Sequence, residues 1–90
     1  MASYVLFCYN ACMIAPEQSR AARGWLAWSQ EDLAQRANTS LSTIRDFEKG
    51  RRIPIKNNLE AIRLAFEMAG ISFMFRGDLA LGIQASLPGG

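Results

Sequence analysis

Hydrophobic positions in residues 29–50 recur at helical spacing in two short runs, with a polar gap between the runs. Ser29 and Ser40 precede the two runs and are good helix N-caps. Asn38 lies in the gap and tolerates the left-handed backbone that a sharp turn requires, and Gly50 suits the end of the second helix. The pattern predicts two short helices joined by a tight turn, which must pack on another element to be stable. The apolar positions are Leu33, Ala34 and Ala37 in the first run, and Leu41, Ile44 and Phe47 in the second.

Two further amphipathic segments flank this pair and complete a helical domain over residues 14–70. Pro16 suits the first turn of the preceding helix. The last helix is predicted to start near Asn57 or Asn58 and to stop at Gly70. Both segments are expected to bury an apolar stripe against the central pair. Before the pair, the predicted stripe consists of Ala21, Trp25 or Leu26, and Trp28. In the last helix it consists of Leu59, Ile62, Ala65, Phe66 and Ala69.

Residues 71–87 replace helical spacing with alternation, which predicts a β-hairpin. Apolar side chains at positions 71, 73 and 75 alternate with Ser72 and Met74, and Arg76-Gly77-Asp78 supplies the turn. Because a two-stranded hairpin is marginal alone, its apolar face is expected to pair with a second copy of the chain. The residues of this dimer interface are predicted to be Phe73, Phe75, Leu79 and Leu81.

Residues 1–13 form an apolar N-terminal arm whose side chains, among them Tyr4, Val5 and Phe7, favour a strand. We expect the arm to extend the hairpin by edge pairing. Met13 is also a plausible start of the chain, and residues 1–12 are then an upstream extension with little role. The sequence leaves these two alternatives open.

Charge is concentrated beside the second central helix. The net charge is only +2, but residues 45–56 carry five basic side chains against the acidic Asp46 and Glu48. A basic cluster at the end of a helix is suited to contact with the phosphates of a nucleic acid. The alternative is an ordinary solvated face. The basic residues are Arg45, Lys49, Arg51, Arg52 and Lys56.

The composition argues against several other classes of protein. The chain has no histidine and only two cysteines, Cys8 and Cys12, so no metal site is expected. It lacks a glycine-rich phosphate loop and a suitably spaced carboxylate pair, which predicts a protein that is not an enzyme and uses no cofactor. The apolar runs are too short to span a membrane. The cysteines are expected to be reduced thiols in the cytoplasm.

Several residues lie at spacings that one family of small regulators shares. They are Ser29-Gln30 at the start of the first helix, Leu33-Ala34 as its buried pair, Ile44 and Phe47 as buried positions of the second helix, Glu48-Lys49-Gly50 as its ending, and then Arg51-Arg52 and Pro54. Over Pro16–Gly70 the chain resembles the phage-repressor/Cro family of transcription regulators, also called XRE-like. The fold class is therefore expected to be mainly α: a small helix-turn-helix bundle of four or five helices with a C-terminal β-hairpin and a candidate N-terminal strand.

The resemblance implies which side chains meet DNA. In this family the second helix of the motif lies in the major groove, with its N-terminal residues facing base edges. Arg45 is then suited to guanine, Asp46 to a cytosine amino group, and Ser42 to either kind of edge. Leu41 either contacts a thymine methyl group or packs into the core. The expected phosphate contacts are Ser29, Gln30, Thr43, Lys49, Arg51 and Arg52, and Arg23 is expected to form a structural ion pair with Glu48.

These features together predict a sequence-specific regulator of double-stranded DNA. The form we favour is a dimeric repressor that reads a palindromic operator through the helix near residues 40–49. The main alternative is a protein-interaction module of the antitoxin or antiactivator type with the same fold. The basic residues beside Arg45 favour DNA, whereas the apolar termini favour a protein partner.

Overall fold

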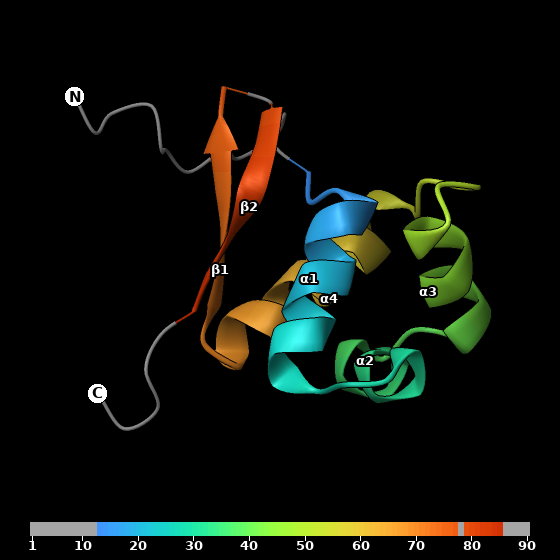
Figure 1. The fold of residues 1–90 in the computed structure, drawn as a ribbon. Coiled ribbons are helices and arrows are strands. Elements are labelled where there is room, and N and C mark those ends of the chain that lie inside the picture. Colours follow the sequence, from blue (N-terminus) through green and yellow to red (C-terminus); the bar gives the residue numbers. More distant parts are fainter. Residues whose placement is uncertain (1–12, 78, 86–90) are drawn as a thin grey trace.

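The computed structural model describes residues 13–77 and 79–85, and this part of the chain forms four helices followed by two strands (Figure 1). The arrangement confirms the predicted mainly α fold with a C-terminal β-hairpin. Residues 1–12 of the predicted N-terminal arm lie outside the described residues. The elements are α1 (Pro16–Leu26), α2 (Gln30–Ala37), α3 (Leu41–Glu48), α4 (Lys56–Met68), β1 (Ile71–Arg76) and β2 (Leu79–Ala85).

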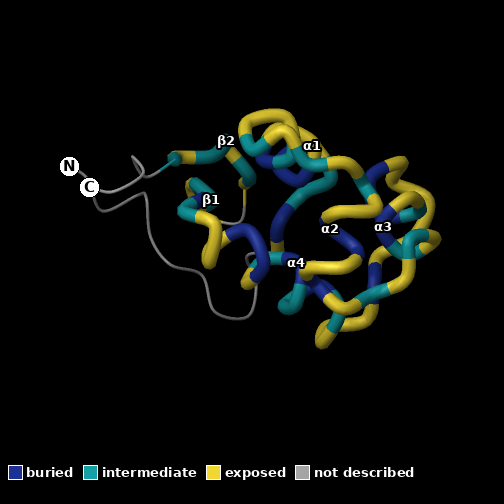
Figure 2. The backbone as a smooth tube through the Cα atoms, turned by 90° about the horizontal axis from the view of Figure 1, so that it is seen from below, coloured by how far each residue is buried: buried dark blue, intermediate teal, exposed yellow. Residues whose placement is uncertain are grey.

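The hairpin and α3 lie on opposite sides of the layer formed by α1 and α4 (Figure 1). α1 packs on α3 and on β2, whereas α4 packs on α2 and on β1. The buried segments face the interior, and the outer turns of the helices are exposed (Figure 2). One hydrophobic core therefore supports both the helix pair and the hairpin. Its large, fully buried side chains include Leu33, Ile44, Ile62, Phe66 and Ile71.

Phe66 of α4 joins distant parts of the fold through ring contacts. Its ring stacks on Trp28 with 5.5 Å between the centroids and an interplanar angle of 17°. Phe73 of β1 meets the same ring edge-on, with the centroids 5.7 Å apart. The guanidinium of Arg36 lies 4.4 Å from the centroid of the Trp28 ring. The stack thus ties the α1–α2 connection, α2 and the hairpin to α4.

The buried side of α1 differs from the prediction. Ala21 is exposed and Trp25 is 67% exposed, whereas Ala22 is buried and Leu26 packs against the core. Trp28 also packs against the core, as predicted. The error arises because the inner side of α1 is partly polar, so hydrophobic spacing alone indicates the wrong side of this helix.

The last helix agrees with the prediction in all but its ends. α4 starts at Lys56, one residue before the expected range, and its four buried side chains belong to the predicted stripe. Ala69 is exposed rather than buried, because it is the C-cap residue beyond the last helical turn. The buried residues are Leu59, Ile62, Ala65 and Phe66.

The two strands of the hairpin are antiparallel and contain one irregularity. Met74 pairs with Gly82 and Phe75 pairs with Ala80, so that Leu81 has no residue opposite it. This extra residue is a β-bulge, which bends the strand and redirects its side chains. Gly77 has a φ of 60° in the turn, as the predicted turn sequence requires.

Most of the aromatic face of the hairpin is covered by its own chain. Phe75 is only 5% exposed, and Phe73 is half-buried against the core. The expectation that a second copy must cover Phe75 is therefore wrong, because α1 and α4 already cover this face of the sheet. Leu79 and Leu81 remain exposed, at 60% and 46%.

Gln18 fastens the hairpin to α1 from a buried position. Its side-chain nitrogen donates to the carbonyl oxygens of Met74 on β1 at 3.1 Å and of Gly82 on β2 at 3.0 Å. Its side-chain oxygen accepts from the N–H of Ala15 at 2.8 Å. The Gln18 amide therefore holds both strands beside the bulge. It also accepts a hydrogen bond from a backbone N–H group at the start of α1 that has no partner within the helix.

Replacing Gln18 with leucine is expected to lower the free energy of unfolding by about 1–3 kcal/mol, because the carbonyl groups of Met74 and Gly82 lose their donor inside the protein. Urea unfolding measures this loss, and hydrogen exchange should accelerate at the hairpin amides first. The matched control is Gln35→Leu at an exposed position of α2. Equal effects of the two substitutions would contradict the role given to Gln18.

Candidate nucleic-acid interface

The turn between α2 and α3 is held by short-range hydrogen bonds. Asn38 ends α2 with φ 55° and ψ 44°, the left-handed conformation expected from the sequence. The N–H of Thr39 donates to the carbonyl oxygen of Ala34 at 2.9 Å. Ser40 caps α3, because its hydroxyl oxygen accepts from the N–H of Thr43 at 3.1 Å. These contacts fix the direction in which α3 leaves the turn.

α3 has a buried side and an exposed side. Ile44, Phe47 and Glu48 are buried against the rest of the fold. Ser42 and Arg45 are exposed on the other side, where Asp46 is partly exposed. Within the described residues, the side chains of Arg45 and Asp46 make no hydrogen bond or ion pair. Both side chains are therefore free to contact a ligand.

Leu41 packs against the core, which is one of the two roles that the sequence left open. Its side chain packs against the core and is also partly exposed at the first turn of α3. Core packing accounts for a leucine at this position without any ligand. The exposed part of the side chain lies on the same turn as Ser42 and is available for an apolar contact.

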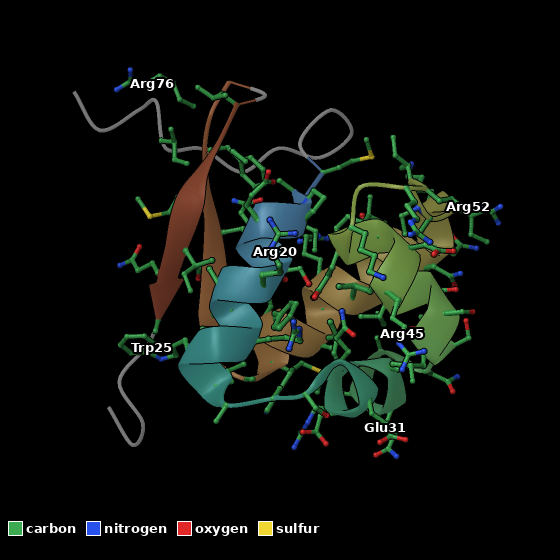
Figure 3. All side chains as sticks on the ribbon, turned by 45° about the vertical axis from the view of Figure 1, so that its right-hand side comes forward. Arg20, Trp25, Glu31, Arg45, Arg52 and Arg76 are labelled. Carbon is green, nitrogen blue, oxygen red and sulfur yellow. The ribbon has the colours of Figure 1, made fainter. Side chains whose placement is uncertain are left out.

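The basic residues after α3 form a rim next to its exposed side. Lys49, Arg51 and Arg52 are all exposed, and Figure 3 shows Arg45 and Arg52 on the side of the molecule away from Arg76 of the hairpin. The N–H groups of Arg51 and Arg52 donate to the carbonyl oxygen of Asp46 at 2.9 and 3.4 Å, which ties the loop to α3. A hollow of about 200 Å³ lies between this loop and α3. Its lining residues are Ser42, Thr43, Asp46, Arg52, Ile53, Pro54, Ile55 and Asn58.

The start of α2 is occupied by a capping box. The hydroxyl oxygen of Ser29 accepts from the N–H of Asp32, and the carboxylate of Asp32 accepts from the N–H of Ser29, both at 2.9 Å. The backbone and side-chain hydrogen bonds with Ser29 hold the pKa of Asp32 below its usual value, so the exposed carboxylate stays ionised. Glu31 adds a second negative charge here. This helix end is therefore less suited to phosphate than the rim after α3.

A buried cluster around Glu48 holds the end of α3 against α1. The carboxylate accepts from Arg23 at 2.7 Å through Nη2 and at 2.9 Å through Nε, which confirms the predicted ion pair. Ser19 donates to it at 2.6 Å and Gln30 at 3.1 Å. Arg20 donates to the backbone carbonyl oxygen of the same glutamate. Both the side chain and the backbone of Glu48 are therefore held by the helices behind α3.

These contacts keep Glu48 ionised although its side chain is 2% exposed. Burial alone would raise its pKa, but hydrogen bonds from Arg23, Ser19 and Gln30 outweigh burial and hold the pKa below the ordinary value of 4.5. The family resemblance predicts Gln30 as a phosphate contact, whereas its side chain reaches inward to Glu48. Ser19 is not among the residues predicted for this ion pair, although it precedes Arg23 by one helical turn and so lies on the same side of α1.

The described residues contain no group of His, Cys, Asp or Glu side chains placed to hold a metal ion. No helix in this part of the chain is both long and apolar enough to cross a membrane. A family model described as helix-turn-helix matches residues 20–68, which is more than half of the 90-residue chain. The match runs from Arg20 in α1 to the end of α4 and leaves out the hairpin. No curated protein matches the chain.

Proposed function

The chain belongs to the helix-turn-helix family of phage-repressor/Cro (XRE-like) regulators, and we propose that it is a cytoplasmic, sequence-specific repressor that acts as a homodimer. It binds DNA through the family's motif. In this proposal the chain acts by occupying its operator and carries out no catalysis of its own. The observation that carries the proposal is the exposed side of α3, where the unpaired side chains of Arg45 and Asp46 lie beside a cationic rim.

The proposed contacts follow from the chemistry of the exposed side chains. Arg45 donates two hydrogen bonds to the major-groove edge of a guanine, and Asp46 accepts from the amino group of a cytosine. Ser42 bonds to a neighbouring base edge. The rim residues Lys49, Arg51 and Arg52 bind phosphates, which sets the position of α3 without reading sequence. The buried contacts of Glu48 with Arg23 and Ser19 support this assignment of base and phosphate contacts, because they keep α3 at one fixed orientation toward the DNA.

Two copies are proposed to read a palindromic site, with their recognition helices about 34 Å apart. In the described part of the hairpin, Leu79 and Leu81 are the large apolar side chains left exposed to a second copy, since Phe75 is buried in its own chain. Two leucine side chains fall short of the roughly 800 Å² per partner that stable interfaces bury. We therefore propose that the two copies pair when both are bound to DNA.

Replacing Arg45 with alanine is expected to weaken binding by about 1–3 kcal/mol and to relax the preference at one base pair. The probe is a duplex selected from random sequence by the parent protein, and fluorescence anisotropy measures affinity for it and for its single-base variants. By contrast, Arg52→Ala should weaken binding to every duplex. It should also lower the slope of the logarithm of the binding constant against the logarithm of the salt concentration by about one.

The matched control is Arg63→Ala on α4, because this arginine is paired with Glu60 and Glu67 outside the proposed interface. It should bind the selected duplex like the parent. If Arg45→Ala keeps the parent's affinity and base preference, α3 does not read the DNA in the proposed way. A folded parent that selects no sequence at all would instead favour a protein-interaction module of the antitoxin or antiactivator type.

A further inference from the structure

A groove of about 520 Å³ lies between α1 and β2. Leu79 and Leu81 on its β2 wall are 60% and 46% exposed. Ala21 on its α1 wall is exposed as well, and Glu17 is the one charged residue among the described residues that line it. The groove and its walls are therefore an exposed surface of mainly small and apolar side chains.

β2 forms one wall of this groove and has an open edge in the described part of the chain. The sheet there has two strands, so β2 pairs with β1 on one side and with no strand on the other. None of the seven side chains of β2 carries a charge, and none is a proline. Because charges and prolines are the residues that usually protect an edge strand, this edge is chemically suited to accept another strand.

We propose that two copies of the chain, bound to neighbouring half-sites of DNA, pair through the open edges of their β2 strands, which run antiparallel across a twofold axis. This pairing rests on the proposed function and names the surface through which the homodimer forms. Antiparallel pairing of two identical edge strands needs a twofold axis perpendicular to the sheet. The two hairpins then form one four-stranded sheet in the order β1-β2-β2-β1.

This symmetry puts both α3 helices on one side of the dimer. Rotation about an axis perpendicular to a sheet does not exchange the two faces of the sheet, so the α1 and α4 helices of both copies cover the same face. In each copy, α3 lies on the far side of that helical layer from the hairpin (Figure 1). Both α3 helices therefore point away from the shared sheet in the same direction, as binding to one duplex requires.

The same symmetry brings apolar side chains together and keeps charges apart. Trp25 of α1 is 67% exposed and lies toward the end of the hairpin opposite Arg76 and the turn (Figure 3). In an antiparallel pair, the Leu79 end of one β2 meets the opposite end of the other, so Trp25 lies toward Leu79 of the partner. The two Glu17 carboxylates, near the start of α1, lie at opposite ends of the interface and do not repel each other.

The bulge at Leu81 explains why the pairing depends on DNA. A bulge interrupts the regular row of hydrogen-bonding groups along an edge strand, which weakens pairing between free copies. Two copies on neighbouring half-sites, by contrast, meet at a high effective concentration. The pairing is therefore expected as cooperative binding to a palindrome rather than as a stable free dimer.

Mixed isotope labelling of the full chain tests the interface directly. The sample holds equal amounts of isotope-labelled, deuterated protein and unlabelled protein, on a palindromic duplex selected from random sequence by the parent. Nuclear Overhauser effects between labelled N–H groups and protons of the unlabelled copy should appear in residues 79–85 and at the Trp25 indole. Effects at β1 or α4 instead, or none between the copies, would overturn the proposal.

Affinity measurements separate this interface from the reading of DNA. Leu79→Asp and Leu81→Asp each place a charge at the shared edge and should lower affinity for the palindrome at least about tenfold. Affinity for a duplex that holds one half-site should stay within about twofold of the parent's. The matched control is Ser72→Asp, at an exposed position of β1, which should bind both duplexes like the parent.

The two duplexes also distinguish failure of the pairing from failure of the proposed function. If both leucine variants lose the same affinity for the palindrome and for the half-site, or lose none, the β2 edge does not join the copies and the proposal is wrong. A parent protein that binds neither duplex would contradict the proposed function itself.

Discussion

Replacing Glu48 with alanine is expected to lower the free energy of unfolding by about 3–5 kcal/mol. The substitution leaves the Arg23 guanidinium partly buried without its carboxylate, and it removes the acceptor of Ser19 and Gln30. Urea unfolding followed by circular dichroism measures the loss. Since a small domain has only about 5–15 kcal/mol of total stability, a large part of it would disappear.

An exposed ion pair on α4 provides the control for this prediction. Glu67→Ala removes a 2.9 Å contact with Arg63, in which both side chains are about one third exposed, and should cost less than about 1 kcal/mol. A loss of similar size in the two variants would mean that the Glu48 cluster contributes no more than a surface pair.

The same cluster predicts a dependence of stability on pH. Because the folded-state pKa of Glu48 lies below the ordinary value of 4.5, its contribution is fully present above that pH and is lost as the pH falls through the lowered pKa. Glu48→Gln binds no proton at this site, so its stability should fall less steeply than that of the parent from neutral pH to about pH 3. Parallel curves would show that another carboxylate causes the acid sensitivity.

Replacing Phe66 with alanine is expected to cost about 3–5 kcal/mol, because it opens a cavity at the centre of the core. It also removes the stacked contact with Trp28 and the edge-on contact with Phe73. Urea unfolding gives the free energy, and hydrogen exchange should show faster opening of the hairpin. Leu64→Ala, at a half-exposed position on the same helix, should change stability by no more than about 0.5 kcal/mol. A loss below about 2 kcal/mol for Phe66→Ala would indicate that the rings do not support one another.

Local chemistry made the helix pair predictable from the sequence. Ser29 and Ser40 cap α2 and α3, and Asn38 takes the left-handed conformation between them. Each of these residues acts on backbone groups within a few positions, so its role can be inferred without the tertiary fold. The pairing of Arg23 with Glu48 is a long-range contact, and the sequence indicated it only through the resemblance to a known family.

The sequence predictions that the structure contradicts concern residues whose partners lie far away in the chain. Gln18 and Ser19 are polar, so hydrophobic spacing does not predict them as core residues, yet they are buried because the hairpin and Glu48 supply their hydrogen-bond partners. Because this side of α1 is partly polar, hydrophobic spacing predicts that Ala21 and Trp25 are buried instead. Alternation shows that the face of the hairpin with Phe75 is apolar, but it does not show what covers that face.

The two sides of α3 have a consequence for how this protein can evolve. Residues that hold the helix in place, such as Phe47 and Glu48, are buried, whereas the side chains of Arg45 and Asp46 make no contact on which the described fold depends. Substitutions on the exposed side therefore cost little stability. Under the proposed function, gene duplication followed by single changes there can produce paralogues with divergent binding preferences, while the buried side keeps the fold.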